Sequence, residues 1–134
     1  LNSNVYRRRL IVLNLLNRYN PDNLIENSPK NSNNTSYVYD KGEIFALCLR
    51  EKKSGENNFH DNGIITFVLL HELSHLSDNN RGHGKTFWEN FKFLLREAKE
   101  IGIYKPVDYS LNPINYCYLD VESNPYFIKN IKDI

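Results

Sequence analysis

Residues 64–88 read IITFVLLHELSHLSDNNRGHGKTFW and hold three of the four histidines of the chain. His71 and His75 are four residues apart, so on an α-helix their imidazoles lie one turn apart on the same face and can bind one metal ion. Glu72 follows His71 directly, which places its carboxylate near the ion without requiring it to be a ligand. The spacing therefore predicts an HExxH metal site on a helix.

His83 is the expected third ligand. It lies eight residues beyond His75, across a loop in which Gly82 and Gly84 can adopt positive φ and turn the chain back toward the helix. Catalytic zinc typically has three protein ligands and keeps one position for water, whose pKa it lowers to about 7. Glu72 would take the proton, direct the hydroxide at a carbonyl and protonate the leaving amine. The pattern predicts hydrolysis of peptide bonds at one catalytic zinc ion.

Other side chains compete for the third position. A glutamate is the alternative ligand, as in thermolysin-like enzymes, and Glu97 lies near the required distance. Glu89 fits better as the partner of Thr86 in a capping box at the start of the next helix. His60 lies outside the spacing, and we expect it in a loop. Both glutamates therefore rank below His83.

The chain before the histidines is expected to hold a helix, a loop and a hairpin. Residues 4–19 carry apolar side chains near helical spacing, whereas the polar residues 20–36 predict a loop. Residues 37–50 contain two runs suited to strands around a turn at 40–42. The nearly continuous apolar run at 44–49 indicates a strand covered on both faces.

Two helices and a tail are expected from the histidine motif onward. Residues 63–78 are apolar on almost every side and predict a central buried helix, capped by Asp61 or Asn62. A second helix is predicted from about residue 86 to Gly102. Three prolines interrupt residues 103–134, so this tail is expected to wrap the core in an extended course.

Length and composition limit the possible classes of protein. At 134 residues the chain is most simply one domain, with an N-terminal helix at 1–19, a catalytic core at 37–102 and a tail at 103–134. The net charge of +1 excludes the strong positive field of a dedicated nucleic-acid binder. Basic runs at 7–9 and 50–53 are read as solvated surface.

Cysteine content and apolar runs predict the cellular setting. Cys48 and Cys117 are too few for a disulfide scaffold, and no leader pattern opens the sequence. The longest apolar run, residues 64–70, is far shorter than a membrane span. We expect a soluble intracellular protein, cytoplasmic or nuclear, with no membrane partner.

HELSH followed by GHGKTFW resembles the WLM and SprT-like (Spartan-type) zinc metallopeptidases, in which a third histidine and then an aromatic residue follow HExxH. The resemblance covers roughly residues 37–102. It implies that His71, His75 and His83 are the zinc ligands and that Glu72 is the catalytic glutamate. The seven residues between the last two histidines exceed the spacing of many WLM proteins, although SprT-like members have longer loops. Metzincins are unlike this chain because they have glycine where this chain has Asp78.

The same resemblance implies a fold and a biology. It implies an α+β, zincin-like fold, with a small antiparallel sheet beside the HExxH helix and an edge strand along which an extended peptide lies. Residues 43–49 would form that strand or its neighbour. The family also implies proteolysis of proteins crosslinked to DNA, with DNA as a stimulating partner.

Two other functions remain open. A metal-dependent RNase of the YbeY type also uses three histidines, but it lacks a glutamate after the first ligand, so Glu72 disfavours it. A non-catalytic binding module would use zinc only to hold its fold, and such sites are usually closed by four ligands. An electrophile that polarises the carbonyl is also usual, and Tyr104, Tyr109 and Tyr116 are candidates without a choice among them.

Overall fold

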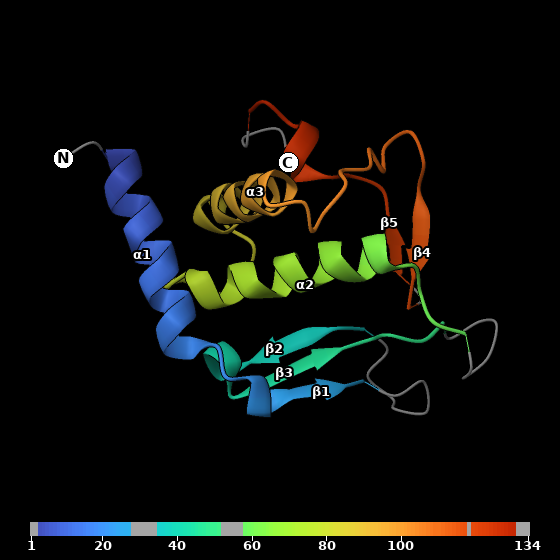
Figure 1. The fold of residues 1–134 in the computed structure, drawn as a ribbon, viewed down its shortest axis with the longest axis horizontal. Coiled ribbons are helices and arrows are strands. Elements are labelled where there is room, and N and C mark those ends of the chain that lie inside the picture. Colours follow the sequence, from blue (N-terminus) through green and yellow to red (C-terminus); the bar gives the residue numbers. More distant parts are fainter. Residues whose placement is uncertain (1–2, 28–34, 52–57, 118, 131–134) are drawn as a thin grey trace.

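The structure is a computed structural model that describes residues 3–27, 35–51, 58–117 and 119–130, and it has an α+β architecture (Figure 1). The described helices are α1 (Ser3–Arg18), α2 (Asn62–Ser77) and α3 (Lys85–Glu100). The described strands are β1 (Leu24–Glu26), β2 (Tyr37–Tyr39), β3 (Ile44–Leu47), β4 (Ile114–Tyr116) and β5 (Leu119–Val121). Short 3-10 turns lie at Pro21–Asn23, Asp40–Gly42 and Pro125–Phe127.

The first three strands form one sheet in the order β1-β3-β2. β2 and β3 form the predicted hairpin, with Val38 opposite Phe45. β1 pairs with β3 in parallel, with Leu24 also opposite Phe45, so the sheet is mixed and the expectation of a purely antiparallel sheet is wrong. The prediction of a loop throughout residues 20–36 is wrong for the same reason. All three residues of β1 are exposed, so pairing with β3, and no burial pattern of its own, makes this segment a strand.

Helix α2 is the centre of the fold. In Figure 1 it lies between the three-stranded sheet and α3, and α1 passes its C-terminal end. The predicted helix and its cap are confirmed, because the Asp61 side chain accepts a hydrogen bond from the backbone N–H of Gly63 at 3.0 Å. The core takes large buried side chains from the sheet, α2, α3 and the tail: Phe45, Leu76, Phe87, Phe91 and Tyr116.

Helix α3 begins without the expected capping box. Its N-cap is Gly84, which makes no side-chain hydrogen bond, and Thr86 already lies within the first turn. Glu89 instead forms ion pairs with Lys85 on the same helix and with Arg7 on α1. The capping prediction is wrong because the Glu89 carboxylate is used to join α1 to α3.

The tail after α3 packs against the core through its tyrosines. Tyr104, Tyr109 and Tyr116 are 5%, 3% and 1% exposed. Contrary to a course of extended segments and turns alone, the tail contains the antiparallel hairpin β4–β5. Each strand has only three residues, which is too short for an alternation pattern to show in the sequence.

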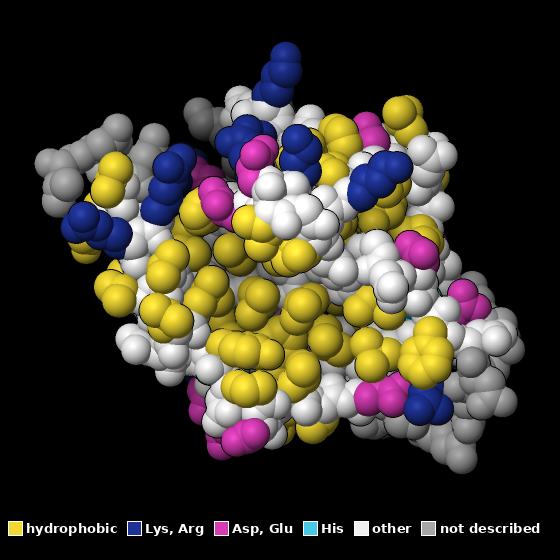
Figure 2. Space-filling model, viewed as in Figure 1, with side chains coloured by type: hydrophobic (Ala, Val, Ile, Leu, Met, Phe, Trp, Pro, Cys, Tyr) yellow, Lys and Arg dark blue, Asp and Glu magenta, His cyan; other side chains and the backbone are white. Residues whose placement is uncertain are grey.

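The surface combines apolar and charged areas. Figure 2 shows hydrophobic side chains across the middle of one face and several Lys and Arg side chains along its upper part, with acidic groups among them. None of the helices within the described ranges has the length and apolar character that crossing a bilayer requires.

Candidate metal centre

The two histidines of the HELSH motif lie on one face of α2. The ring centroids of His71 and His75 are 5.2 Å apart, as expected for side chains one helical turn apart. Both rings are partly buried, whereas Glu72 between them is only 5% exposed. Within little more than one turn, the helix therefore carries two neighbouring imidazoles and a buried carboxylate.

The loop after α2 brings His83 back to this pair. Gly82 adopts a φ of 81°, in the region that favours glycine, and the chain reverses direction there. The Nε2 atoms of His83 and His75 are 3.0 Å apart, and one ring nitrogen from each of the three histidines lies within 4.8 Å of the others. Tetrahedral zinc with Zn–N distances of 2.0–2.1 Å needs nitrogens about 3.3 Å apart. The donor set and its spacing fit one zinc ion.

An aromatic floor supports the three rings. Phe87 lies 4.9 Å from His71, 4.4 Å from His75 and 4.7 Å from His83 between ring centroids. The Trp88 ring lies 5.8 Å from His83. The GKTFW segment that follows the third histidine thus holds this loop histidine against the helix.

Two cations on distant segments fix the end of α2. The Arg18 guanidinium donates to the carbonyl of Leu76 at 2.7 Å, and the Lys41 ammonium donates to the carbonyl of His75 at 2.9 Å. Lys41 also donates to the carbonyl of Asn80 at 2.7 Å, in the loop that leads to His83. Positive groups stabilise the C-terminal end of a helix, where carbonyls lack partners. The motif gives no sign of these residues, because Lys41 is 34 positions from His75 and Arg18 is 58 positions from Leu76.

Burial sets the protonation of the site. It lowers the pKa of His71 to about 3 and that of His75 to about 4, and the neighbouring imidazoles shift both in the same direction. The pKa of His83 is also lowered by burial. All three rings are therefore neutral near pH 7, which is the form that binds metal. Burial raises the pKa of Glu72 to about 8.

The four residues open into one cavity of about 910 Å³. One wall is formed by residues 35–41, which include the edge strand β2. Tyr116 and residues 119–123 of the tail hairpin also line the cavity, and the Tyr116 hydroxyl is hydrogen-bonded to that of Ser36. The histidines therefore lie in a groove that runs along the edge of the sheet.

The competing glutamates lie elsewhere. Glu89 and Glu97 border a separate cavity between α1 and α3, together with Arg7 and Lys92. Neither lines the cavity that holds the three histidines. The structure thus brings His83 to the helix pair and leaves the alternative ligands apart from it.

The candidate tyrosines differ in position. Among the three, Tyr116 lines the histidine cavity, but its hydroxyl donates to the Cys48 carbonyl at 2.6 Å. The Tyr104 hydroxyl accepts from the Asn124 amide at 2.9 Å, and Tyr104 is not among the residues that line this cavity. In these positions no tyrosine of the three is identified as the electrophile.

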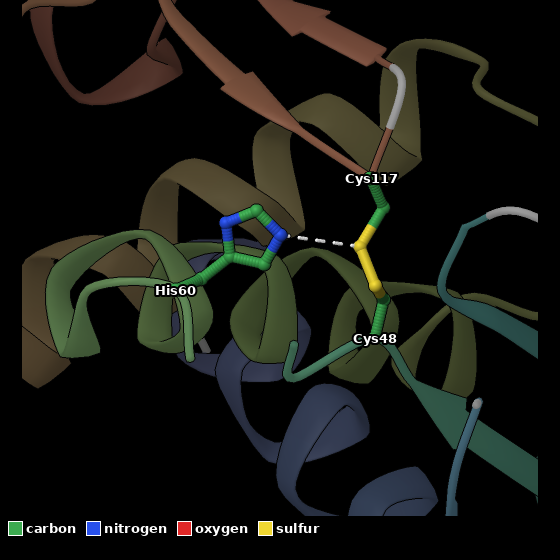
Figure 3. A group of neighbouring side chains, drawn as sticks. All are labelled: Cys48, His60 and Cys117. Carbon is green, nitrogen blue, oxygen red and sulfur yellow. Dashed lines mark hydrogen bonds between the residues drawn. A yellow bond between two sulfur atoms is a disulfide. The ribbon is translucent and has the colours of Figure 1, made fainter. Parts of the chain in front are cut away.

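A second group of side chains was not predicted from the sequence. His60 does lie in a loop, between the bridge at Phe59 and the cap of α2, but it is only 7% exposed. It neighbours Cys48 and Cys117, which are joined as a disulfide (Figure 3). The pairing spans 69 positions, so no local spacing could indicate it.

Comparisons with known proteins agree with the motif. The WLM domain matches residues 9–111, a wider span than the histidine region because it includes most of α1. The chain is 37% identical over 108 residues to the uncharacterized protein R325 of Acanthamoeba polyphaga mimivirus, covering 81% of this chain and 53% of that protein. It is 34% identical over 108 residues to the uncharacterized protein 136R of Invertebrate iridescent virus 6, covering 79% and 56%.

A third relative, the uncharacterized protein 042R of Invertebrate iridescent virus 3, is 33% identical over 107 residues, covering 80% of this chain and 60% of that protein. The chain thus spans little more than half the length of these relatives. No solved structure gives a significant match. The match over residues 9–111 shows that the chain belongs to the WLM family.

Proposed function

We propose that this chain is a zinc-dependent metallopeptidase with a zincin-like site, in which His71, His75 and His83 bind zinc and Glu72 is the catalytic base. The observation that carries the proposal is the convergence of three neutral imidazoles beside a buried carboxylate in one groove. Membership of the WLM family, which is metallopeptidase-like, supports the same class.

The residues divide the reaction among them. Zinc, when bound, supplies Lewis-acid chemistry, because it lowers the pKa of water and polarises a carbonyl. Glu72 accepts the proton of the attacking water and delivers it to the leaving amine. Burial raises the pKa of Glu72 to about 8, and positive charge held by the three histidines would favour its ionised form, which a base requires.

Strand β2 offers a place for the substrate main chain. It is an edge strand, since the sheet order places β3 on one side of it, and residues 35–41 line the histidine groove. An extended peptide can add to such an edge through main-chain hydrogen bonds. The expected platform at residues 43–49 corresponds to β3, the neighbour of the edge strand. We therefore propose extended peptides or unfolded protein segments as substrates.

Proteins crosslinked to DNA are the finer substrate proposal, and an intracellular setting belongs to it. This finer proposal is supported by the family resemblance. The basic run at 7–9 adds no support, because Arg7 pairs with Glu89 and the Arg8 guanidinium lies 5.6 Å from the Phe93 ring within the protein itself. Residues 52 and 53 of the second basic run lie outside the described residues. The matched region covers only 53% of the mimivirus relative, so DNA binding by the whole protein is likewise a proposal.

The test is a Glu72→Gln variant, compared with the exposed Glu97→Gln as a matched control. We expect one zinc per chain in wild type and both variants, and a loss of peptide cleavage of about 10²–10⁴-fold only in Glu72→Gln. Full cleavage by Glu72→Gln would contradict the proposal. Cleavage of RNA but not peptides would favour the RNase instead, and zinc without any cleavage would favour a binding module. Assays of a DNA-binding protein with and without DNA separate the finer proposal from the general one.

A further inference from the structure

Cys48, His60 and Cys117 form a buried cluster outside the histidine groove (Figure 3). The two cysteines are disulfide-bonded, and the Nε2 atom of His60 lies 3.3 Å from Sγ of Cys117. We propose that this cluster is a redox-modification site, at which a reversible disulfide fixes the β4–β5 hairpin to the end of β3 and thereby completes one wall of the groove.

The disulfide joins the end of β3 to the tail hairpin. Cys48 directly follows β3, and Cys117 directly follows β4 at the turn of the hairpin. Cys117 has a φ of 47°, a left-handed conformation that is costly for a residue with a side chain. β4 and β5 are three residues each and pair with each other, not with the larger sheet. A two-stranded hairpin of this size is not stable alone, so its position depends on the packing of Tyr116 in the core and on this covalent tie.

Hydrogen bonds through Ser36 and Tyr116 connect the disulfide to the lining of the groove. The Tyr116 hydroxyl donates to the Cys48 carbonyl at 2.6 Å, and the backbone N–H of Cys48 donates to Ser36 Oγ at 2.8 Å. Ser36 and Tyr116 both line the groove, and their hydroxyls are hydrogen-bonded to each other. Residues 119–123 continue the wall that Tyr116 begins. Opening the disulfide therefore loosens the groove wall formed by the hairpin.

His60 supplies the group that thiol chemistry needs. Its ring packs 4.8 Å from the Tyr116 ring, and burial lowers its pKa, so it is neutral and can accept a proton. In the reduced protein, Nε2 would take the proton of the Cys117 thiol as that sulfur attacks a small disulfide such as oxidised glutathione. One glutathione thiol leaves, and the Cys48 thiolate then displaces the second. The protein gives up two electrons and two protons, and one oxidised glutathione becomes two thiols.

Limited access to the sulfurs slows both the formation and the reduction of the disulfide. Cys48 is 0% exposed and Cys117 is 1% exposed, so the closed disulfide is shielded from reductants. Cys117 at the hairpin turn becomes reachable when the hairpin moves away from β3. We therefore expect slow exchange that follows opening of the hairpin, and faster exchange when the hairpin is destabilised.

A metal site is the competing explanation for the same three residues. Structural zinc sites are almost always closed by four protein ligands. The described chain offers three donors here, with no fourth ligand grouped with them.

The experiment compares the full chain after oxidised glutathione with the same chain after dithiothreitol, without substrate. Alkylation and mass spectrometry should show both thiols lost with no attached glutathione, and Cys48→Ala should instead retain glutathione on Cys117. The oxidised form should unfold roughly 10 °C higher, and amides of residues 114–121 should exchange at least about tenfold more slowly. His60→Gln should slow disulfide formation at least about tenfold without changing the final state.

Two thiols that stay reduced, or equal unfolding temperatures and amide exchange in both forms, would overturn the proposal. A second zinc per chain that disappears in Cys117→Ser would assign a metal site instead. The wild-type comparison needs no variant to fold. The effect on substrate binding rests on the proposed peptidase function, whereas the thiol, unfolding and exchange readouts do not, so failure of one is distinguishable from failure of the other.

Discussion

The histidine groove and the cysteine cluster lie on either side of Tyr116, which lines the first and packs against His60 of the second. Each brings together three potential ligand side chains. The histidines of the groove are partly buried or exposed, whereas all three members of the cysteine cluster are buried. Open sites suit chemistry on an incoming substrate, and closed sites suit structural roles.

The two clusters also differ in how the chain assembles them. The groove takes its ligands from 13 consecutive residues, 71–83, on one helix and its following loop. The cysteine cluster takes its members from the end of β3, the loop before α2 and the tail hairpin. The first therefore depends on local geometry, and the second depends on the packing of the whole domain.

The largest expected effect is on zinc affinity, which should depend on the histidine groove and not on the cysteine cluster. His75→Ala should weaken zinc binding by more than about 100-fold, because loss of a supporting partner alone typically costs 10–100-fold and this change removes a ligand. His60→Ala is the control and should bind zinc as tightly as wild type. Zinc competition with a chromophoric chelator measures both. Equal loss in the two variants would mean that the clusters do not have separate roles.

Removing the disulfide should lower stability without removing zinc. Cys48→Ala combined with Cys117→Ala should reduce the free energy of unfolding by about 2–4 kcal/mol, since the bond closes a long loop in the unfolded chain. Urea unfolding under oxidising conditions measures the loss, and the reduced wild type is the control. A stability equal to oxidised wild type would show that the bond does not constrain the chain.

Arg18→Met tests the support of the groove from α1. The change removes charged hydrogen bonds to carbonyls at the end of α2, so we expect a loss of about 1–3 kcal/mol in the free energy of unfolding. Arg9→Met on the same helix is exposed and is the matched control. Thermal unfolding of both variants provides the comparison. Equal stability would indicate that Arg18 does not cap α2.

The smallest effect concerns pH. Burial lowers the pKa of His71 to about 3 and of His75 to about 4. Both rings therefore stay neutral at pH values well below 6.5, the usual pKa of histidine. The zinc dissociation constant should therefore rise less than about tenfold between pH 7 and 5.5, whereas two exposed histidines would lose about 100-fold. Chelator competition across this range measures it. A rise of 100-fold or more would show that the rings titrate as exposed groups.

Sequence patterns predicted the elements whose apolar residues recur at the short spacing of a helix or strand. The helices around residues 4–19 and 63–78 and the hairpin at 37–50 are confirmed, because their apolar spacing and turn residues act within a few positions. β1 and the β4–β5 hairpin were not predicted, because strands of three residues carry no measurable alternation. The capping role of Glu89 was wrong because a distant arginine pairs with that carboxylate.

The sequence by itself determined the candidate ligands and base, since the HExxH spacing and a glycine-flanked histidine are local features that one helix and one loop bring together. Only the tertiary structure decided what supports them. Arg18 and Lys41 reach the end of α2, and Cys48 meets Cys117, across separations of 34 to 69 residues. Such contacts form when buried surfaces bring remote segments together, and the spacing of residues along the chain does not record them.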